Sequence, residues 1–161
     1  MEDKEKRIRA ITRIYYSNPK VQESLLAFAK DREVVPRYFE SFGKRPDIVQ
    51  YYSDVSNLVK NGATSFHCSE ELWEDPLQLN SEISTREMHE LRKGWDLLID
   101  IDSKYLDVSK ILTILILDSL EKHGIRNYGV KFSGNKGMHI IVSSRAFPKE
   151  FNDHKTTEMF P

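Results

Sequence analysis

The sequence has little of several features that define common protein classes. Its one cysteine, Cys68, excludes an internal disulfide and a cysteine-rich zinc site. Its apolar runs are shorter than the roughly 20 residues that a membrane-spanning helix needs, and no apolar signal core follows the charged first residues. Lysine and arginine number 24 against 25 acidic residues, so no basic excess indicates a nucleic-acid partner, although a local basic groove is compatible with this balance. These absences predict a cytoplasmic protein without zinc and without a membrane partner.

A chain of 161 residues is long enough for one structural domain with a hydrophobic core. Apolar residues recur at helical spacing over 4–16, 19–29 and 48–59, which predicts a mainly helical part over residues 1–62. Residues 63–161 contain the strand-like segments and form the predicted catalytic core. The whole pattern predicts an α+β fold in which helices and a mixed central sheet share one domain.

The second half of the chain has a clear order of elements. An apolar strand over 95–102 is followed by a helix over 108–123, a strand over 126–132, a tight turn and a last strand over 138–143. Strand, helix and strand predict a parallel βαβ unit, to which the last strand adds an antiparallel partner. Apolar residues cover most of the surface of the 108–123 helix, so we expect this helix to be largely buried.

Two acids end the apolar strand. Side chains alternate across a strand, so Asp100 and Asp102 share one face, while Asp96 stands at the strand start and is expected to be solvated or paired. Two carboxylates at this spacing repel each other unless a cation lies between them, and Mg²⁺ prefers one or two carboxylates plus substrate phosphates. Taken alone, such a pair is more often a strand end with two solvated acids than a metal site.

The turn before the last strand is rich in glycine. Gly134 and Gly137 allow backbone amides to point into one concavity, which is a common way to hold phosphate. Ser133 adds a hydroxyl, Lys136 adds a charge, and His139 follows on the next strand; Asn135 completes the turn. The alternative is an ordinary hairpin with a surface lysine and a satisfied histidine. A phosphate cradle beside two acids favours nucleotide chemistry with divalent metals.

The two motifs resemble those of the archaeo-eukaryotic primase superfamily. Its first motif is an apolar strand ending in Asp-x-Asp, here Leu97 to Asp102, and its second is Ser-Gly-x-x-Gly-x-His before an apolar strand, here Ser133 to Val142. The resemblance covers about residues 65–147. Members include the small catalytic subunit of primases and the polymerase domain of bacterial end-joining ligases. The resemblance implies an RRM-like catalytic core and metal-dependent transfer of nucleotides from nucleoside triphosphates to a primer or initiating nucleotide on a DNA template.

The resemblance also implies roles for residues. Asp100 and Asp102 would be catalytic and hold two Mg²⁺ or Mn²⁺ ions, and the segment from Ser133 to Gly137 with His139 would bind the triphosphate. The expected partners are nucleoside triphosphates and single-stranded or primer-template DNA, with a large primase subunit as an optional one.

The family's third acidic motif has no clear counterpart in the sequence. The acids after His139 are Glu150, Asp153 and Glu158, all close to it in a loop-like tail. We therefore expect either a chain cut before that motif or a non-catalytic, nucleotide-binding accessory subunit. An end-joining repair polymerase is a further alternative.

Aromatic and basic residues cluster in the first half. We expect the aromatics to pack in the core, although aromatics near arginine and lysine can also stack on bases. The aromatic residues are Tyr38, Phe39, Phe42, Tyr51 and Tyr52, and the basic residues that could line a template path are Arg32, Arg37, Lys44, Arg45 and Lys60.

Overall fold

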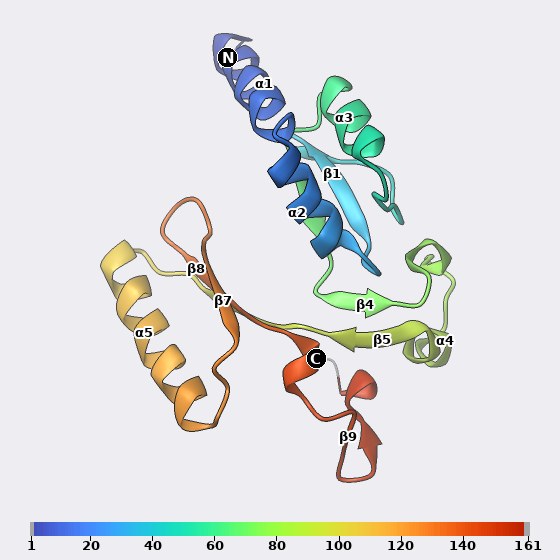
Figure 1. The fold of residues 1–161 in the computed structure, drawn as a ribbon, viewed down its shortest axis with the longest axis vertical. Coiled ribbons are helices and arrows are strands. Elements are labelled where there is room, and N and C mark those ends of the chain that lie inside the picture. The colour runs from blue at the N-terminus through green and yellow to red at the C-terminus, as the bar shows by residue number, and fades with distance from the viewer. Residues whose placement is uncertain (1, 160–161) are drawn as a thin grey trace. The chain divides into compact units, whose positions relative to one another are not determined.

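The computed structural model describes residues 2–159 and has an α+β fold, in which helices accompany several small antiparallel sheets (Figure 1). The chain divides into two compact units, with the division in the sequence between Lys93 and Gly94, and each is described separately below. The expected boundary after residue 62 lies inside the first unit.

The first unit begins with helices α1 (Glu2–Tyr16) and α2 (Pro19–Ala29). Asn18 caps α2 by accepting a hydrogen bond from the Lys20 amide, and Pro19 occupies the first helical position, as its fixed backbone angle favours. A third helix, α3 (Tyr52–Lys60), starts four residues later than the sequence pattern predicts. The expected helical start of the chain is therefore confirmed.

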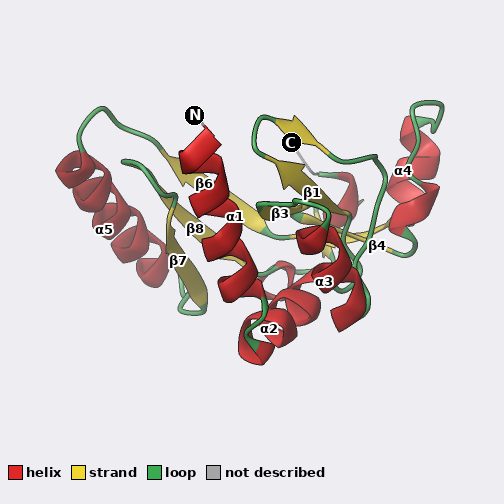
Figure 2. Cartoon of the chain, turned by 90° about the horizontal axis from the view of Figure 1, so that it is seen from above, coloured by secondary structure: helices red, strands yellow, loops and turns green. Residues whose placement is uncertain are grey.

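These helices pack on a three-stranded antiparallel sheet with the order β2-β1-β3 (Figure 2). The strands are β1 (Val34–Tyr38), β2 (Ser41–Phe42) and β3 (Ser65–Cys68). One face of the sheet joins the core, in which Val34 packs with Ala29 of α2 and with Val55 and Val59 of α3. Of these strands only β3 follows from the sequence, in which residues 63–69 partly alternate and predict a short strand.

The rest of the first unit is β4 (Glu71–Trp73), the 3-10 helix η1 (Pro76–Gln78) and α4 (Thr85–Leu91). The spacing of Thr85, Met88 and Leu91 allows a short helix here, and the structure has one, which begins with a capping box of Ser84 and Glu87. β4 pairs with β5 (Arg92–Trp95), the strand in which the first unit ends.

The second unit is built around a three-stranded antiparallel sheet. Its elements are β6 (Leu97–Ile101), α5 (Leu106–Lys122), β7 (Tyr128–Phe132) and β8 (Met138–Val142), and the strand order is β6-β8-β7. β6 and β7 run in the same direction, but the prediction that they are neighbours is wrong, because β8 lies between them. The tight turn sends the chain straight back, and the apolar β8, with Ile140 and Val142 fully buried, takes the central place.

The second unit ends in short elements: the 3-10 helix η2 (Ser144–Ala146), the hairpin of β9 (Glu150–Phe151) and β10 (His154–Lys155), and the 3-10 helix η3 (Thr156–Glu158). The indole of Trp95 donates a hydrogen bond to the Thr156 carbonyl and stacks on Phe147, which ties this tail to the start of the unit.

Helix α5 packs on the sheet through an unexpected face. Its buried residues are Ser109 and Thr113, whereas five aliphatic side chains are exposed: Val108, Ile111, Leu112, Ile114 and Leu115. The expectation that α5 is largely buried is wrong, because small side chains allow the helix to approach the sheet closely and leave the larger ones outside. Within residues 2–159 no helix combines the length and the apolar character needed to cross a membrane.

Candidate nucleotide and metal site

A row of three polar side chains crosses the exposed face of the second unit's sheet. Asp100 of β6 pairs in register with His139 of β8, and His139 pairs in register with Lys131 of β7. Directly opposite residues in a sheet point to the same side, so the three share one face. The Nε2 atom of His139 lies 3.3 Å from a carboxylate oxygen of Asp100. The row therefore places an acid beside an imidazole and a lysine on the far side of that imidazole.

Strand alternation separates the acids from the core. Ile101, which lies between Asp100 and Asp102, is buried at 6% exposure, while both acids are exposed. The Asp100 side chain is 64% exposed despite its contact with His139. Asp102 makes no hydrogen bond or ion pair with any residue in the described part of the chain. Both carboxylates therefore retain oxygens that can bind a cation from solvent.

The glycine turn packs directly against the end of β6. A Cβ atom built on Gly137 would lie 2.9 Å from the Ile101 carbonyl oxygen and 2.7 Å from the Ser133 hydroxyl oxygen, so the backbones approach more closely than any other residue would allow. The Ser133 amide donates to the Gly137 carbonyl at 3.0 Å and closes the turn. Gly134 has a φ of 106°, a conformation that glycine adopts readily. The turn and the acids thus meet at one end of the sheet.

Within this turn several donors are unused. The amides of Gly134, Asn135 and Lys136 donate no hydrogen bond to other described residues, and the side chains of Asn135 and Lys136 are exposed without a partner among them. Peptide N–H groups that converge in a glycine turn can hold an anion, and the Lys136 ammonium adds a positive charge. The turn therefore has the donor set of a phosphate cradle.

The structure brings the predicted acids, turn and histidine together, but it adds no third acid. Among residues 2–159 no group of three or more histidine, cysteine, aspartate or glutamate side chains is arranged to hold a metal ion. Glu150, Asp153 and Glu158 are exposed in the β9–β10 hairpin and η3. Asp96 is buried and accepts a hydrogen bond from the Ser144 amide at 2.8 Å, so it is one of the paired acids rather than a solvated one.

Lys131 is the residue that sequence reasoning missed. The lysine is exposed, and no hydrogen bond or ion pair connects it to the described part of the chain. The sequence contained a signal for Lys131, because Lys131 and Ser133 are two residues apart and residues at this spacing share a strand face. The position of β8 between β6 and β7 is what brings this lysine beside His139.

The strand that carries Lys131 is fixed to α5 at its other end. The hydroxyl of Tyr128, at the start of β7, donates a hydrogen bond to the Glu121 carboxylate in the last turn of α5. This hydrogen bond, to a negatively charged group, raises the pKa of Tyr128. The phenol therefore stays protonated and keeps donating well above neutral pH.

Comparisons with known proteins give a similarity of low identity. No family model matches the chain. An uncharacterized protein of Methanocaldococcus jannaschii, MJECS07, is 26% identical over 117 residues, which are 72% of this chain and 25% of that protein. The chain thus spans about a quarter of the length of the relative it matches, and the name of that relative assigns no activity.

Proposed function

We propose that the second unit is the catalytic core of a primase-polymerase, which transfers nucleotides from nucleoside triphosphates to a primer or initiating nucleotide on a DNA template. The observation that carries this proposal is the meeting of the acids with the glycine turn. Asp100 contacts His139 across the β6–β8 pair, and Gly137 packs on the carbonyl of Ile101, between the two acids. A triphosphate in the turn would then lie beside both carboxylates.

The chemistry of the donors fits a divalent cation shared with substrate. Asp100 and Asp102 supply hard oxygen ligands, and Mg²⁺ is commonly held by one or two carboxylates together with substrate phosphates rather than by an all-protein cage. Bound there, Mg²⁺ or Mn²⁺ would neutralise phosphate charge and lower the pKa of an attacking hydroxyl. The absence of a three-residue metal cluster among the described residues is compatible with this shared mode.

The remaining residues of the site have roles that follow from their positions. The amides of Gly134 to Lys136 and the Ser133 hydroxyl would bind phosphate oxygens, and Lys136 would balance their charge. His139, held by Asp100, would present its ring to the same phosphates. Lys131 would add a second ammonium from the far side of the imidazole. This division keeps acids and phosphate donors at neighbouring but separate positions.

The topology supports a primase-type core of the RRM-like kind. The second unit begins with the strand β6, the helix α5 and the hairpin of β7 and β8, and β8 lies beside β6. This arrangement forms the first half of a split βαβ fold. The outer edge of β6 has no strand partner within residues 2–159, which is the edge that a further strand would occupy in such a fold.

A second function is favoured by the missing third acid. Two carboxylates can bind a metal nucleotide without supporting transfer, so a nucleotide-binding accessory subunit derived from a primase is the alternative. An end-joining repair polymerase would use the same site residues and would differ in its DNA substrate. Only assays with different DNA substrates can therefore distinguish it from a replication primase.

Calorimetric titration with a nucleoside triphosphate and Mn²⁺ tests the site. The double variant Asp100→Asn with Asp102→Asn should lose about tenfold or more in metal-dependent affinity, because the charge that holds the cation is removed. Asp107→Asn is the matched control, since Asp107 is an exposed acid of α5 outside the site. Equal affinity of the double variant and the wild type would refute the metal site.

Extension of a labelled primer on a DNA template then separates the two functions. If the wild type extends the primer and the double variant does not, the result supports the polymerase. Metal-dependent binding without extension, on recessed and on end-joining substrates alike, supports the accessory subunit.

A further inference from the structure

The segment over residues 70–91 of the first unit is strongly acidic. It contains seven acids and one arginine, whereas the whole chain has 25 acids and 24 lysines and arginines. Such a local excess creates a negative potential in a chain whose net charge is near zero. The acids are Glu70, Glu71, Glu74, Asp75, Glu82, Glu87 and Glu90, and the arginine is Arg86.

Two hollows lie on this segment, and all of their lining residues belong to the first unit. The larger hollow has a volume of about 1000 Å³ and extends to β1 and β3, and the smaller one has a volume of about 510 Å³. Asn80 and Ile83 line both hollows, so the two adjoin, and we call them together the acidic groove. Its apolar lining residues include Val35, Trp73, Leu79, Ile83, Met88 and Leu91.

Carboxylates dominate the charged residues of the acidic groove. Among the described residues, six acids line it against one arginine, Arg45. Arg45 donates two hydrogen bonds to the buried carboxylate of Glu33, so these two charges balance each other. The carboxylates of Glu70 and Glu82 are exposed and make no ion pair or hydrogen bond with the part of the chain that the structure describes. The charge that the groove offers to a ligand is therefore negative.

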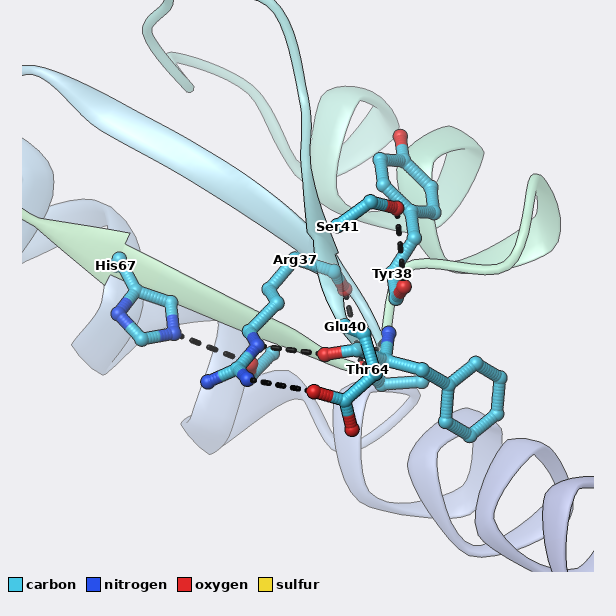
Figure 3. Close-up of polar contacts among 8 residues, drawn as sticks. Arg37, Tyr38, Glu40, Ser41, Thr64 and His67 are labelled. Carbon is cyan, nitrogen blue, oxygen red and sulfur yellow. Dashed lines mark hydrogen bonds and ion pairs between the residues drawn. The ribbon is translucent and has the colours of Figure 1, made fainter.

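Phe42 adds an exposed aromatic ring to the lining of the larger hollow. It is 54% exposed, which contradicts the expected core packing; Tyr51 and Tyr52 are also more than half exposed. The Arg37 guanidinium lies 5.3 Å from the Phe42 ring centroid, but it also pairs with Glu40 at 3.8 Å, as Figure 3 shows. The arginine beside the ring thus has a carboxylate partner of its own.

Two further arginines near the acidic groove are buried. Arg92 pairs with Glu71 at 2.7 Å. Arg32 donates hydrogen bonds to backbone carbonyls, so the expectation that it could line a template path is wrong. Neither arginine balances the exposed carboxylates of Glu70 and Glu82.

The larger hollow also has an unused hydrogen-bond donor among its lining residues. Trp73 is 2% exposed, and its indole N–H has no acceptor among the described residues. A buried N–H without an acceptor is destabilising, and a peptide carbonyl is an acceptor that can satisfy it.

We propose that the acidic groove binds an extended segment of a partner protein in which lysine or arginine residues alternate with apolar ones. The apolar side chains would enter the two hollows on either side of Ile83, and the cationic ones would face Glu70 and Glu82. A backbone carbonyl of the segment would supply the acceptor for Trp73. Charge complementarity selects a basic partner and disfavours a polyanion. This binding needs only the first unit and does not depend on nucleotidyl transfer by the second.

The test is fluorescence anisotropy with a fluorescein-labelled peptide of four Lys-Leu-Ser repeats, in EDTA and low salt. The same peptide with glutamate in place of lysine should bind at least about tenfold more weakly, because like charges then oppose each other. A peptide with serine in place of leucine should also lose at least about tenfold, because the apolar contacts are removed. Equal affinity for any two of these peptides would overturn the proposal, as would displacement of the first peptide by an equal concentration of spermine.

Substitutions in the acidic groove locate the binding. Glu70→Gln and Glu82→Gln should each weaken binding of the Lys-Leu-Ser peptide by about 2- to 5-fold, the effect of one exposed ion pair. Ile83→Ala should weaken it by about 3- to 10-fold, because a half-buried apolar side chain is shortened. Glu23→Gln is the matched control and should bind like the wild type, since Glu23 is an exposed acid of α2 outside both hollows. Wild-type affinity in both glutamine variants would overturn the proposal even if Ile83→Ala failed to fold.

The two tryptophans give a direct readout in a ¹⁵N–¹H correlation spectrum. The Trp73 indole signal should move as the peptide is added. The Trp95 signal should stay in place, because its N–H already donates to the Thr156 carbonyl in the second unit. A Trp73 signal that does not move at saturation would overturn the proposal. Because EDTA removes divalent metal and no nucleotide is present, failure here is separate from failure of the nucleotide site.

Discussion

Replacing Gly137 with alanine should push the glycine turn away from the end of β6. The added Cβ would lie 2.9 Å from the Ile101 carbonyl oxygen, and ordinary contacts begin near 3.4 Å, so the two backbones must separate by about 0.5 Å. The Ser133 hydroxyl at 2.7 Å can rotate away, but a carbonyl of β6 cannot move without its strand. Forced overpacking of this kind costs about 1–3 kcal/mol of unfolding free energy.

Gly129→Ala is the matched control. Gly129 lies on β7 of the same sheet, and a Cβ there would meet no atom within 4 Å. Both substitutions reduce the freedom of the unfolded chain by the same amount, worth about 0.4–1 kcal/mol, so their difference isolates the steric contact. Gly129→Ala should therefore be as stable as the wild type or slightly more so.

Thermal unfolding followed by circular dichroism measures the difference. A chain of this size shifts its melting temperature by about 2–4 °C per kcal/mol, so Gly137→Ala should melt about 2–12 °C below Gly129→Ala. Calorimetry should also show weaker metal-nucleotide binding by Gly137→Ala at a temperature where it is folded. Equal melting of the two variants would refute the close packing of the turn on β6, and with it the geometry on which the proposed site depends.

Two further substitutions test the packing of each unit. Ser109→Ala in α5 should raise the free energy of unfolding by about 1 kcal/mol in urea titrations, because the Ser109 hydroxyl is fully buried without a hydrogen-bond partner; a loss of stability would show that this hydroxyl is satisfied. Burial raises the pKa of Glu71 although Arg92 opposes the shift, so its ionisation weakens the fold as pH rises from the unfolded-state value near 4.5 through the folded one. Wild-type stability relative to Glu71→Gln should therefore fall as the pH rises above about 4.5 in melts at each pH, and a constant difference would contradict the raised pKa.

Local patterns in the sequence predicted the elements that carry the candidate site. Alternation around Ile101 predicted that Asp100 and Asp102 point away from the core, and both are exposed while Ile101 is buried. The glycine-rich stretch predicted the turn. The neighbour of β6 was not predictable, because periodicity describes one strand at a time and cannot say which strand pairs with which. That choice decided whether His139 or a residue of β7 would contact Asp100.

The first unit was harder to predict. Proline disfavours helix at the residue before it, so Pro36 predicts a break after the second helix, yet it lies inside β1. β2 pairs in register only with Arg37 and Tyr38, and on that side Pro36 uses its carbonyl alone, which accepts a hydrogen bond from the Gly43 amide at 2.8 Å. The expectation that the aromatic residues pack in the core was wrong for Phe42, because the sequence around Phe42 could not show which face of the sheet the helices would leave open.

The register between β6 and β8 makes the apolar core a determinant of the polar chemistry. Ile99 pairs with the fully buried Ile140, one residue from the pairing of Asp100 with His139. A slip of one residue would turn every side chain of β6 to the opposite face and direct Asp100 toward the helix side. Residues that no substrate reaches therefore help to determine the geometry of the site. A substitution at Ile140 should be tolerated only if the new side chain keeps the shape of isoleucine, and hydrophobicity alone should not be enough.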